Sequence, residues 1–284
     1  MKVEFYEDIN EFIDLAFPFL LKNEAENNLA FMILNSLKEN LHRYGDYKPH
    51  LITVSENDEI KLISFRTPPY NQFISYTDIL ITVDLLIEEL IKKNAILPGV
   101  LGFKKGAERF AKLWCMRNGL KPQLVRNERG HKLIQVAEET IGNRTFIIGT
   151  EANQSIILKW AEEMVLEAGL MTEAGQMERT LNQIKQDIID QKMFLLLDND
   201  EPVSMARNAG KTPNGNLINF VYTPPHLRRN GYATECVAKL SKQLLDGGNK
   251  FCFLFTDLAN PISNSIYQKI GYRPVIDLDE YKFL

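Results

Sequence analysis

The stretch TPPHLRRNGYAT, at residues 223–234, decides how this sequence is interpreted. Its two prolines end a strand, because proline has no N–H to offer a ladder. Gly231 permits a tight turn and a close backbone approach to a ligand, and an amphipathic helix follows. The free N–H groups at such a helix start predict an anion site of the kind that binds phosphate. Arg228 and Arg229 would add charged donors. The alternative is a surface loop with solvated arginines.

Length and composition predict a soluble intracellular protein of two domains or one large one. The chain has 284 residues, of which 45% are hydrophobic and 25% charged, and its net charge is −4. This acidic balance argues against a nucleic-acid partner, which needs a basic face. The start of the chain does not resemble a secretion signal, and acidic residues interrupt the longest apolar run, ILITVDLLIEEL. Three cysteines without metal-ligand spacing predict no metal and fit a reducing cytoplasm.

Patterns of apolar residues predict two halves, 1–143 and 144–284, with the same order of elements. For the first half we expect the strand KVEFY, helices over 8–42, the hairpin HLITVS and IKLISFR, the strand NQFISY, a helix over 77–93 capped by Thr77 or Asp78, the strand GVLGF, a helix over 104–118, and the strands KPQLVR and HKLIQVAE joined by an NERG turn. For the second half we expect FIIGT, helices over 153–168 and 173–191, the hairpin MFLLLD and PVSMARNAG, LINFVYT, the helix YATECVAKLSKQLL, FCFLF, a helix after Asn260 and Pro261, and a final strand pair.

The shared order suggests a diverged internal duplication. The two copies differ at one place. The first half passes from NQFISY almost directly into its helix, whereas the second half inserts PPHLRRNG. Only the second half therefore has the arginine loop.

Two segments of the second half resemble the GNAT superfamily of acyl-CoA N-acyltransferases. VYTPPHLRRNGYA is similar to its acyl-CoA-binding motif, which reads Arg or Gln, two residues, Gly, one residue, and Gly or Ala. Arg228, Gly231 and Ala233 match that motif in order. NPISNSIYQKIGYRPV resembles a second family segment, which Asn260, Pro261, Tyr267, Gly271 and Tyr272 match, with Ser263 where alanine is commoner. The resemblance covers 144–284, and the first half looks like a degenerate copy.

The resemblance implies an α/β (α+β) fold of two tandem GNAT-like domains. Each would be a mixed, mostly antiparallel twisted sheet flanked by helices. Residues 1–143 would form a degenerate N-terminal domain and 144–284 a catalytic acetyltransferase domain. The implied cosubstrate is acetyl-CoA, with no metal.

The resemblance also implies the site residues. Strand backbone would pair with the pantetheine arm and loop amides would hold the pyrophosphate, which gives the cofactor-binding set Val221, Tyr222, Thr223, Arg228, Arg229, Asn230, Gly231, Tyr232, Ala233, Thr234 and Asn260. Tyr267 would be the general acid that protonates the departing thiolate. Read without the resemblance, Tyr267 is a packing aromatic residue. Asn260 also suits a helix N-cap before a proline, and the two roles are compatible.

The expected function is transfer of an acetyl group from acetyl-CoA to a primary amine by direct attack. The general base stays unassigned, with Asn219, Asp257 and Glu173 as neighbours of the expected site. A non-catalytic module that binds CoA or acyl-CoA is the alternative, and a tandem aminoacyl-tRNA-dependent transferase is a third possibility. The acceptor would be a small-molecule or peptide amine, bound by hypothesis between the halves of a cytoplasmic monomer or homodimer.

Overall fold

The computed structural model describes residues 1–169, 175–258 and 261–284. Two compact units make up the chain. Unit 1 contains Met1–Gly130, a short piece that starts at Thr256, and Pro274–Leu284. Unit 2 contains His131–Phe255 and the segment that ends at Arg273.

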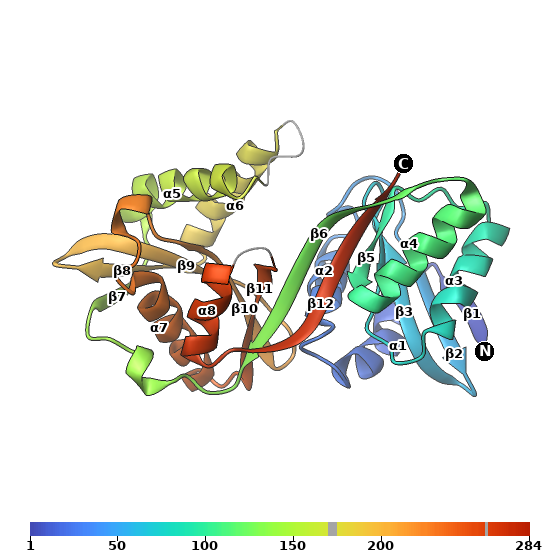
Figure 1. The fold of residues 1–284 in the computed structure, drawn as a ribbon, viewed down its shortest axis with the longest axis horizontal. Helices are drawn as coiled ribbons and strands as arrows, with labels where there is room; N and C mark the ends of the chain where they lie inside the picture. The colour runs from blue at the N-terminus through green and yellow to red at the C-terminus, as the bar shows by residue number, and fades with distance from the viewer. Residues whose placement is uncertain (170–174, 259–260) are drawn as a thin grey trace. The chain divides into compact units, whose positions relative to one another are not determined.

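Unit 1 is a sheet covered by helices on both faces (Figure 1). Its elements are β1 (Lys2–Tyr6), α1 (Ile9–Leu21), α2 (Asn28–Glu39), β2 (His50–Glu56), β3 (Glu59–Arg66), β4 (Gln72–Ile74), α3 (Ile81–Lys92), β5 (Gly99–Phe103), α4 (Lys104–Asn118), β6 (Pro122–Leu133) and β12 (Arg273–Phe283). The strands lie in the order β1-β2-β3-β4-β5-β12-β6. Neighbours from β1 to β4 are antiparallel, and β4 runs parallel to β5.

Unit 2 repeats this arrangement. Its elements are η1 (Glu138–Thr140), β7 (Thr145–Ile148), η2 (Glu151–Asn153), α5 (Gln154–Glu167), α6 (Gln176–Ile189), β8 (Met193–Asp198), β9 (Glu201–Lys211), β10 (Gly215–Tyr222), η3 (Pro225–Leu227), α7 (Tyr232–Asp246), β11 (Phe251–Asp257) and α8 (Pro261–Ile270). The strand order is β11-β10-β9-β8-β7, and β10 runs parallel to β11. Each unit therefore joins four antiparallel strands to a parallel fifth, as a duplication predicts.

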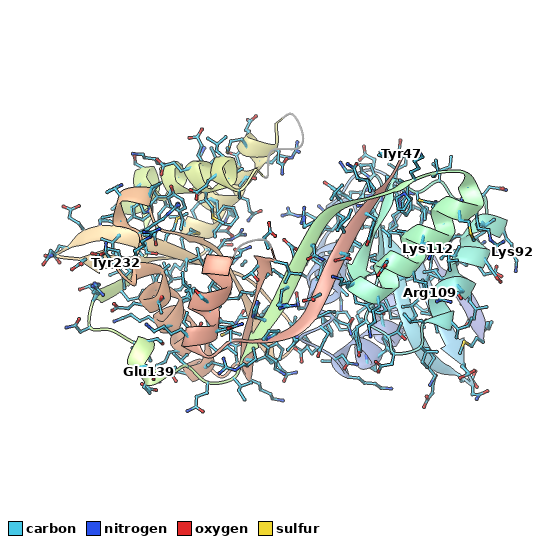
Figure 2. The ribbon with its side chains drawn as sticks, in the orientation of Figure 1. Tyr47, Lys92, Arg109, Lys112, Glu139 and Tyr232 are labelled. Carbon is cyan, nitrogen blue, oxygen red and sulfur yellow. The ribbon has the colours of Figure 1, made fainter. Side chains whose placement is uncertain are left out.

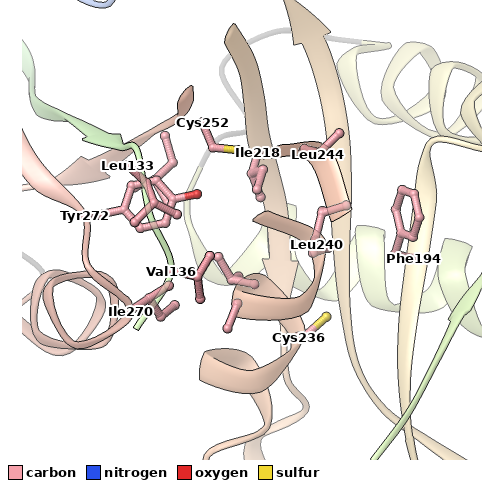
Figure 3. Close-up of a cluster of buried hydrophobic side chains, with 14 of the residues drawn as sticks. Leu133, Val136, Phe194, Ile218, Cys236, Leu240, Leu244, Cys252, Ile270 and Tyr272 are labelled. Carbon is pink, nitrogen blue, oxygen red and sulfur yellow. The ribbon is translucent and has the colours of Figure 1, made fainter. Parts of the chain in front are cut away.

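Successive side chains along each strand point to opposite faces of the unit 2 sheet, so a separate core forms on each face. One core packs α5 and α6 against Met193, Leu195, Met205 and Tyr222. The other packs α7 against Phe194, Leu196 and Ile218, and Leu133, Val136 and Tyr272 complete it (Figure 3). The two faces can therefore present different chemistry on either side of β10.

Most expected elements are present, and the structure corrects three of them. The segment NERG is no turn, because β6 runs unbroken from Pro122 to Leu133. The expected final strand pair is the single strand β12. Helix α3 begins only at Ile81, and neither Thr77 nor Asp78 caps it: Thr77 Oγ1 accepts from the N–H of Ile79, and Asp78 accepts from the Tyr76 hydroxyl.

The last strand of the chain is part of the unit 1 sheet. Residues Leu278–Lys282 of β12 pair antiparallel with Gly99–Phe103 of β5. The Phe283 ring also stacks near Phe110 and Trp114 of α4, with centroid distances of 6.4 Å to each. The compact units consequently differ from a single cut near residue 143, and the domain limits 1–143 and 144–284 stay a prediction.

Candidate functional site

A bulge and an open edge distinguish the end of β10. Between the pairs Asn219–Arg207 and Tyr222–Met205, β10 has two residues where β9 has one. Phe220 lies in this bulge with φ +48°. Such bulges bend a strand and release its ladder groups. Among the described strands, β10 pairs with β11 only over Gly215–Leu217. The edge of β10 beyond Leu217 can therefore receive an extended ligand.

The loop after β10 presents a row of free backbone donors. The N–H of Glu235 makes the first bond at the start of α7, to the carbonyl of Gly231. Within the described residues, the N–H groups of 229–234 have no hydrogen-bond acceptor. Arg229 and Gly231 both adopt left-handed backbone, with φ +68° and +78°. Helix starts with free N–H groups attract anions, so this loop has the donors for a phosphate group.

Arg228 ties the loop to the rest of unit 2. Its Nη1 and Nη2 donate to the two carboxylate oxygens of Glu167, at 2.8 and 2.6 Å. Its Nε donates to the carbonyl of Thr223 at 2.9 Å, and its guanidinium lies 5.7 Å from the ring centre of Tyr222. The hydrogen bonds from Arg228 lower the pKa of Glu167. Arg228 therefore holds the loop in place, where the sequence suggested a phosphate donor.

Arg229 is the exposed cation of the loop. No carboxylate in the described part of the chain pairs with its guanidinium. Asn230 turns its side-chain amide inward and donates to the carbonyl of Leu227 at 3.1 Å. Tyr232, labelled in Figure 2, donates its hydroxyl proton to Asp198 at 2.7 Å. Ala233 and Thr234 are half-buried in the first turn of α7.

The strand residues next to the loop are well anchored. The carbonyl of Tyr222 accepts from Ser204 Oγ at 3.1 Å, and the hydroxyl of Thr223 bonds to the same Ser204 Oγ at 3.0 Å. The Tyr222 hydroxyl donates to Glu163 at 3.0 Å. Burial, followed by this bond, raises the pKa of Tyr222 to about 12. Val221 packs against the α7 core.

Tyr267 lies half-buried on α8 and packs against the α7 core. Its ring meets that of Tyr272 edge-on, with 6.0 Å between centroids. Among the described residues its hydroxyl has no hydrogen-bond partner. Burial raises the pKa of Tyr267 above the usual range, so the phenol keeps its proton at every physiological pH. Asn260, the other residue expected here, lies outside the described residues.

The three residues considered as neighbours of the site for a general base do not lie together in one unit. Asn219 lies on β10 directly before the bulge, and its Oδ1 is buried without a hydrogen bond. Asp257 is the last residue of β11 and belongs to unit 1. Glu173 lies outside the described residues. Sequence reasoning missed Arg207, which faces Asn219 across the β9–β10 ladder, because nothing local marks a strand arginine as buried.

The corresponding loop of unit 1 uses several of its backbone donors internally. The N–H of Ser75 bonds to the carbonyl of Ile63, and the N–H of Tyr76 bonds to Asn27 Oδ1 at 2.9 Å. The N–H of Ile79 bonds to Thr77 Oγ1 at 3.1 Å. Within the described residues, this loop therefore has no run of free N–H groups as long as the one at 229–234.

Comparisons with known proteins agree with this geometry. A family model described as FR47-like protein matches residues 197–282, which run from the end of β8 into β12 and include the loop. No curated protein matches the chain. Among solved structures, an acetyltransferase of the GNAT family from Colwellia psychrerythraea superposes with a TM-score of 0.60 at 10% identity, and the match covers 100% of both chains.

Two further structures extend this likeness. A Drosophila protein gives a TM-score of 0.64 at 12% identity, over 99% of this chain and 98% of its own. A GCN5-related N-acetyltransferase from Sphaerobacter thermophilus gives 0.56 at 13%, over 86% and 84%. The predicted resemblance to the GNAT superfamily is therefore confirmed, and so is the fold class of two tandem GNAT-like domains.

The described residues contain neither a membrane-spanning helix nor a metal-binding cluster. None of the helices there is both long and apolar enough to cross a membrane. No three or more His, Cys, Asp or Glu side chains gather there in a way that could hold a metal.

Proposed function

We propose that unit 2 is an N-acetyltransferase that moves an acetyl group from acetyl-CoA to a primary amine. The observation that carries the proposal is the row of free N–H groups at 229–234, which follows the open edge of β10 after a short loop. Acetyl-CoA joins a pyrophosphate to an extended, amide-bearing arm and an activated thioester. The loop offers donors to the pyrophosphate, and the strand edge offers backbone partners to the amide-bearing arm.

The residues of this loop would have different roles in binding acetyl-CoA. Amides of 229–234 would face the pyrophosphate, with Arg229 beside them as a free cation. Arg228 would hold the loop through Glu167 and Thr223. Gly231 keeps the helix start open, because nothing lies within 4 Å of where its Cβ would be and its backbone is left-handed.

The bulge of β10 would polarise the thioester carbonyl. A backbone N–H released from the ladder in such a bend can act as an oxyanion-hole donor. Phe220 and Val221 supply the two N–H groups of the bulge. An amine that attacks from the side of α5 and α6 would then develop its charge beside a fixed donor.

Tyr267 would donate to the departing sulfur. A thiol has a pKa near 8.5 and an unperturbed tyrosine one near 10. Burial raises the pKa of Tyr267 further, so full proton transfer is more costly than for an exposed tyrosine. The same shift keeps the phenol neutral and able to donate a hydrogen bond. We assign Tyr267 the role of proton donor on this basis, and leave the base unassigned.

The test is to titrate the purified chain with acetyl-CoA by calorimetry and then to follow thiol release over a panel of amines. Binding together with amine-dependent thiol release would support the proposal. Binding without release from any amine would favour a regulatory module that senses acyl-CoA. Absence of binding would overturn both.

A further inference from the structure

Two buried polar atoms without partners lie next to the bulge of β10. They are Asn219 Oδ1 and Arg207 Nε, and neither has a hydrogen bond within the described residues. Buried polar groups are nearly always paired, and an unpaired one costs about 1–3 kcal/mol. Such atoms at a bulge are therefore a reason to look for a ligand.

The two atoms lie on the same face of the sheet. Asn219 and Arg207 are direct partners in the antiparallel β9–β10 ladder, so their side chains project to one side with Cβ atoms about 5 Å apart. Arg207 is also the ladder partner of Met193, which packs into the core under α5 and α6. The pair therefore faces α5 and α6, opposite the face that α7 covers.

The surrounding charges hold Arg207 without using its Nε. Its Nη2 lies 2.7 Å from Asp187 Oδ2 of α6, and its guanidinium lies 5.5 Å from the ring centre of Phe220. Asp187 also receives a hydrogen bond from Gln183 at 3.2 Å and has Lys192 at 3.9 Å. Lys192 in turn pairs with Asp190 at 2.7 Å. These four charges balance, so the site suits a small dipolar or neutral group better than a second cation.

We propose that Asn219 and Arg207 recognise the α-aminoacyl unit of the acceptor. This inference rests on the proposed function. The amine N–H of the acceptor would donate to Asn219 Oδ1, and an oxygen on the neighbouring carbon would accept from Arg207 Nε. In an α-aminoacyl unit, the carbon that carries the amine also carries a carbonyl or carboxylate group. Such a compound satisfies both atoms at once. The amine nitrogen then lies beside the bulge, where the thioester carbonyl would be polarised.

Free amino acids and the first residue of a peptide share this chemistry. L-Alanine, L-alaninamide and L-alanyl-L-alanine carry the oxygen as carboxylate, amide and peptide carbonyl, and ethylamine lacks it. Thiol release from acetyl-CoA gives kcat/KM for each compound. The values are compared per unprotonated amine, since the amine pKa values differ. Comparison of the first three compounds shows whether a free amino acid, an amino-acid amide or the first residue of a peptide is preferred.

Two variants of the full chain test the residues. Asn219→Leu keeps the size of the side chain and removes the acceptor, and Arg207→Lys keeps a cation for Asp187 and removes Nε. Lys185→Met is the control, since Lys185 is exposed on α6, lies outside these four charges, and its side chain bonds only to Asn182 among the described residues. Calorimetry with acetyl-CoA verifies that each variant retains the folded cofactor site. If Arg207→Lys fails to fold, Asn219→Leu decides alone.

We expect kcat/KM for at least one oxygen-bearing compound to exceed that for ethylamine about 10-fold or more in the wild type and in Lys185→Met. That ratio should fall toward unity in Asn219→Leu and Arg207→Lys. Thiol release without such a preference, or with a preference that both variants keep, would overturn the inference and leave the transferase intact. No release from any amine would overturn the proposed function and this inference with it.

Discussion

Arg228 and Glu167 form a two-bond ion pair that joins the loop before α7 to the last residue of α5. The pair fixes a loop whose backbone is left-handed at Arg229 and Gly231. About half of the Glu167 side chain is exposed, so the pair is screened by solvent. Its importance therefore lies in the position of the loop more than in the stability of the fold.

Glu167→Gln should weaken acetyl-CoA binding several-fold while it changes the free energy of unfolding by less than about 1 kcal/mol. The amide keeps the size of the side chain and loses the charge that orients Arg228. Calorimetry gives the affinity, and denaturant unfolding gives the stability. Glu162→Gln is the matched control, because Glu162 is exposed on the same helix and its carboxylate has no partner among the described residues.

The same pair predicts a dependence on pH. Arg228 lowers the pKa of Glu167 in the folded state. A carboxylate with a lowered pKa stabilises the fold at pH values above its unfolded pKa, near 4.3, and that contribution disappears as the pH falls through the lower folded pKa. The difference in stability between wild type and Glu167→Gln should therefore vanish in acid. A difference that grows on acidification would contradict the assignment.

Gly231→Glu should abolish acetyl-CoA binding. The new carboxylate would lie among the free N–H groups of 229–234 and occupy the anion site with a like charge. The left-handed backbone at this position adds a cost of about 1–2 kcal/mol for any side chain. Calorimetry with acetyl-CoA measures the loss.

Gly119→Glu is the control that separates the effect of the new charge in the anion site from the cost of the left-handed backbone. Gly119 has φ +68° at the C-terminus of α4, and nothing lies within 4 Å of its missing Cβ, so the backbone cost matches that of Gly231. This control should be destabilised to a similar extent and should bind acetyl-CoA like the wild type. Equal loss of binding in the two variants would show that strain, and not the anion site, is responsible.

Local signals were enough to predict the order of elements in both units. The hairpin turn at Asn199 and Asp200 has the positive φ values, +49° and +65°, that its residue types favour. Gly271 ends α8 with φ +119°. Each of these features depends on a few consecutive residues, so a single sequence contains the information.

Features that depend on distant partners could not be predicted in this way. The segment 127–130 has the composition of a turn, yet Asn127 donates to Asp279 and Arg129 pairs with Asp277 on β12. The partners are about 150 residues apart, and no local pattern connects them. The candidate site likewise has features that a local motif predicts and features that depend on distant partners. Its loop was visible as a motif, whereas the ion pair of Arg228 and the buried pair of Asn219 and Arg207 were not.

Leu278→Ala should destabilise unit 1, although Leu278 lies near the end of the chain. Its side chain is buried and its backbone pairs with Phe103 of β5. Removal of a buried leucine costs about 2–5 kcal/mol. Hydrogen exchange should show faster opening of β5, with Lys282→Ala as a control on the same strand. Unchanged protection of β5 would contradict the placement of β12 in the unit 1 sheet.

Tyr267→Phe should lower kcat by about 100-fold or more and leave the affinity for acetyl-CoA nearly unchanged, because general-acid catalysis contributes a factor of that order. The substitution removes only a hydroxyl that has no partner in the described residues, so the fold should tolerate it. Thiol release under saturating amine gives kcat, and calorimetry gives the affinity.

Tyr272→Phe is the matched control for this prediction. The Tyr272 hydroxyl is buried and bonds to Ser241 Oγ at 2.8 Å, so its removal should cost about 1 kcal/mol of stability without a selective effect on kcat. The pH profile gives an independent check. Because burial raises the pKa of Tyr267, turnover in the wild type should not fall through loss of the phenolic proton up to about pH 10, where an ordinary tyrosine titrates. A Tyr267→Phe enzyme with unchanged kcat would remove Tyr267 from the mechanism and leave it as a packing residue of the α7 core.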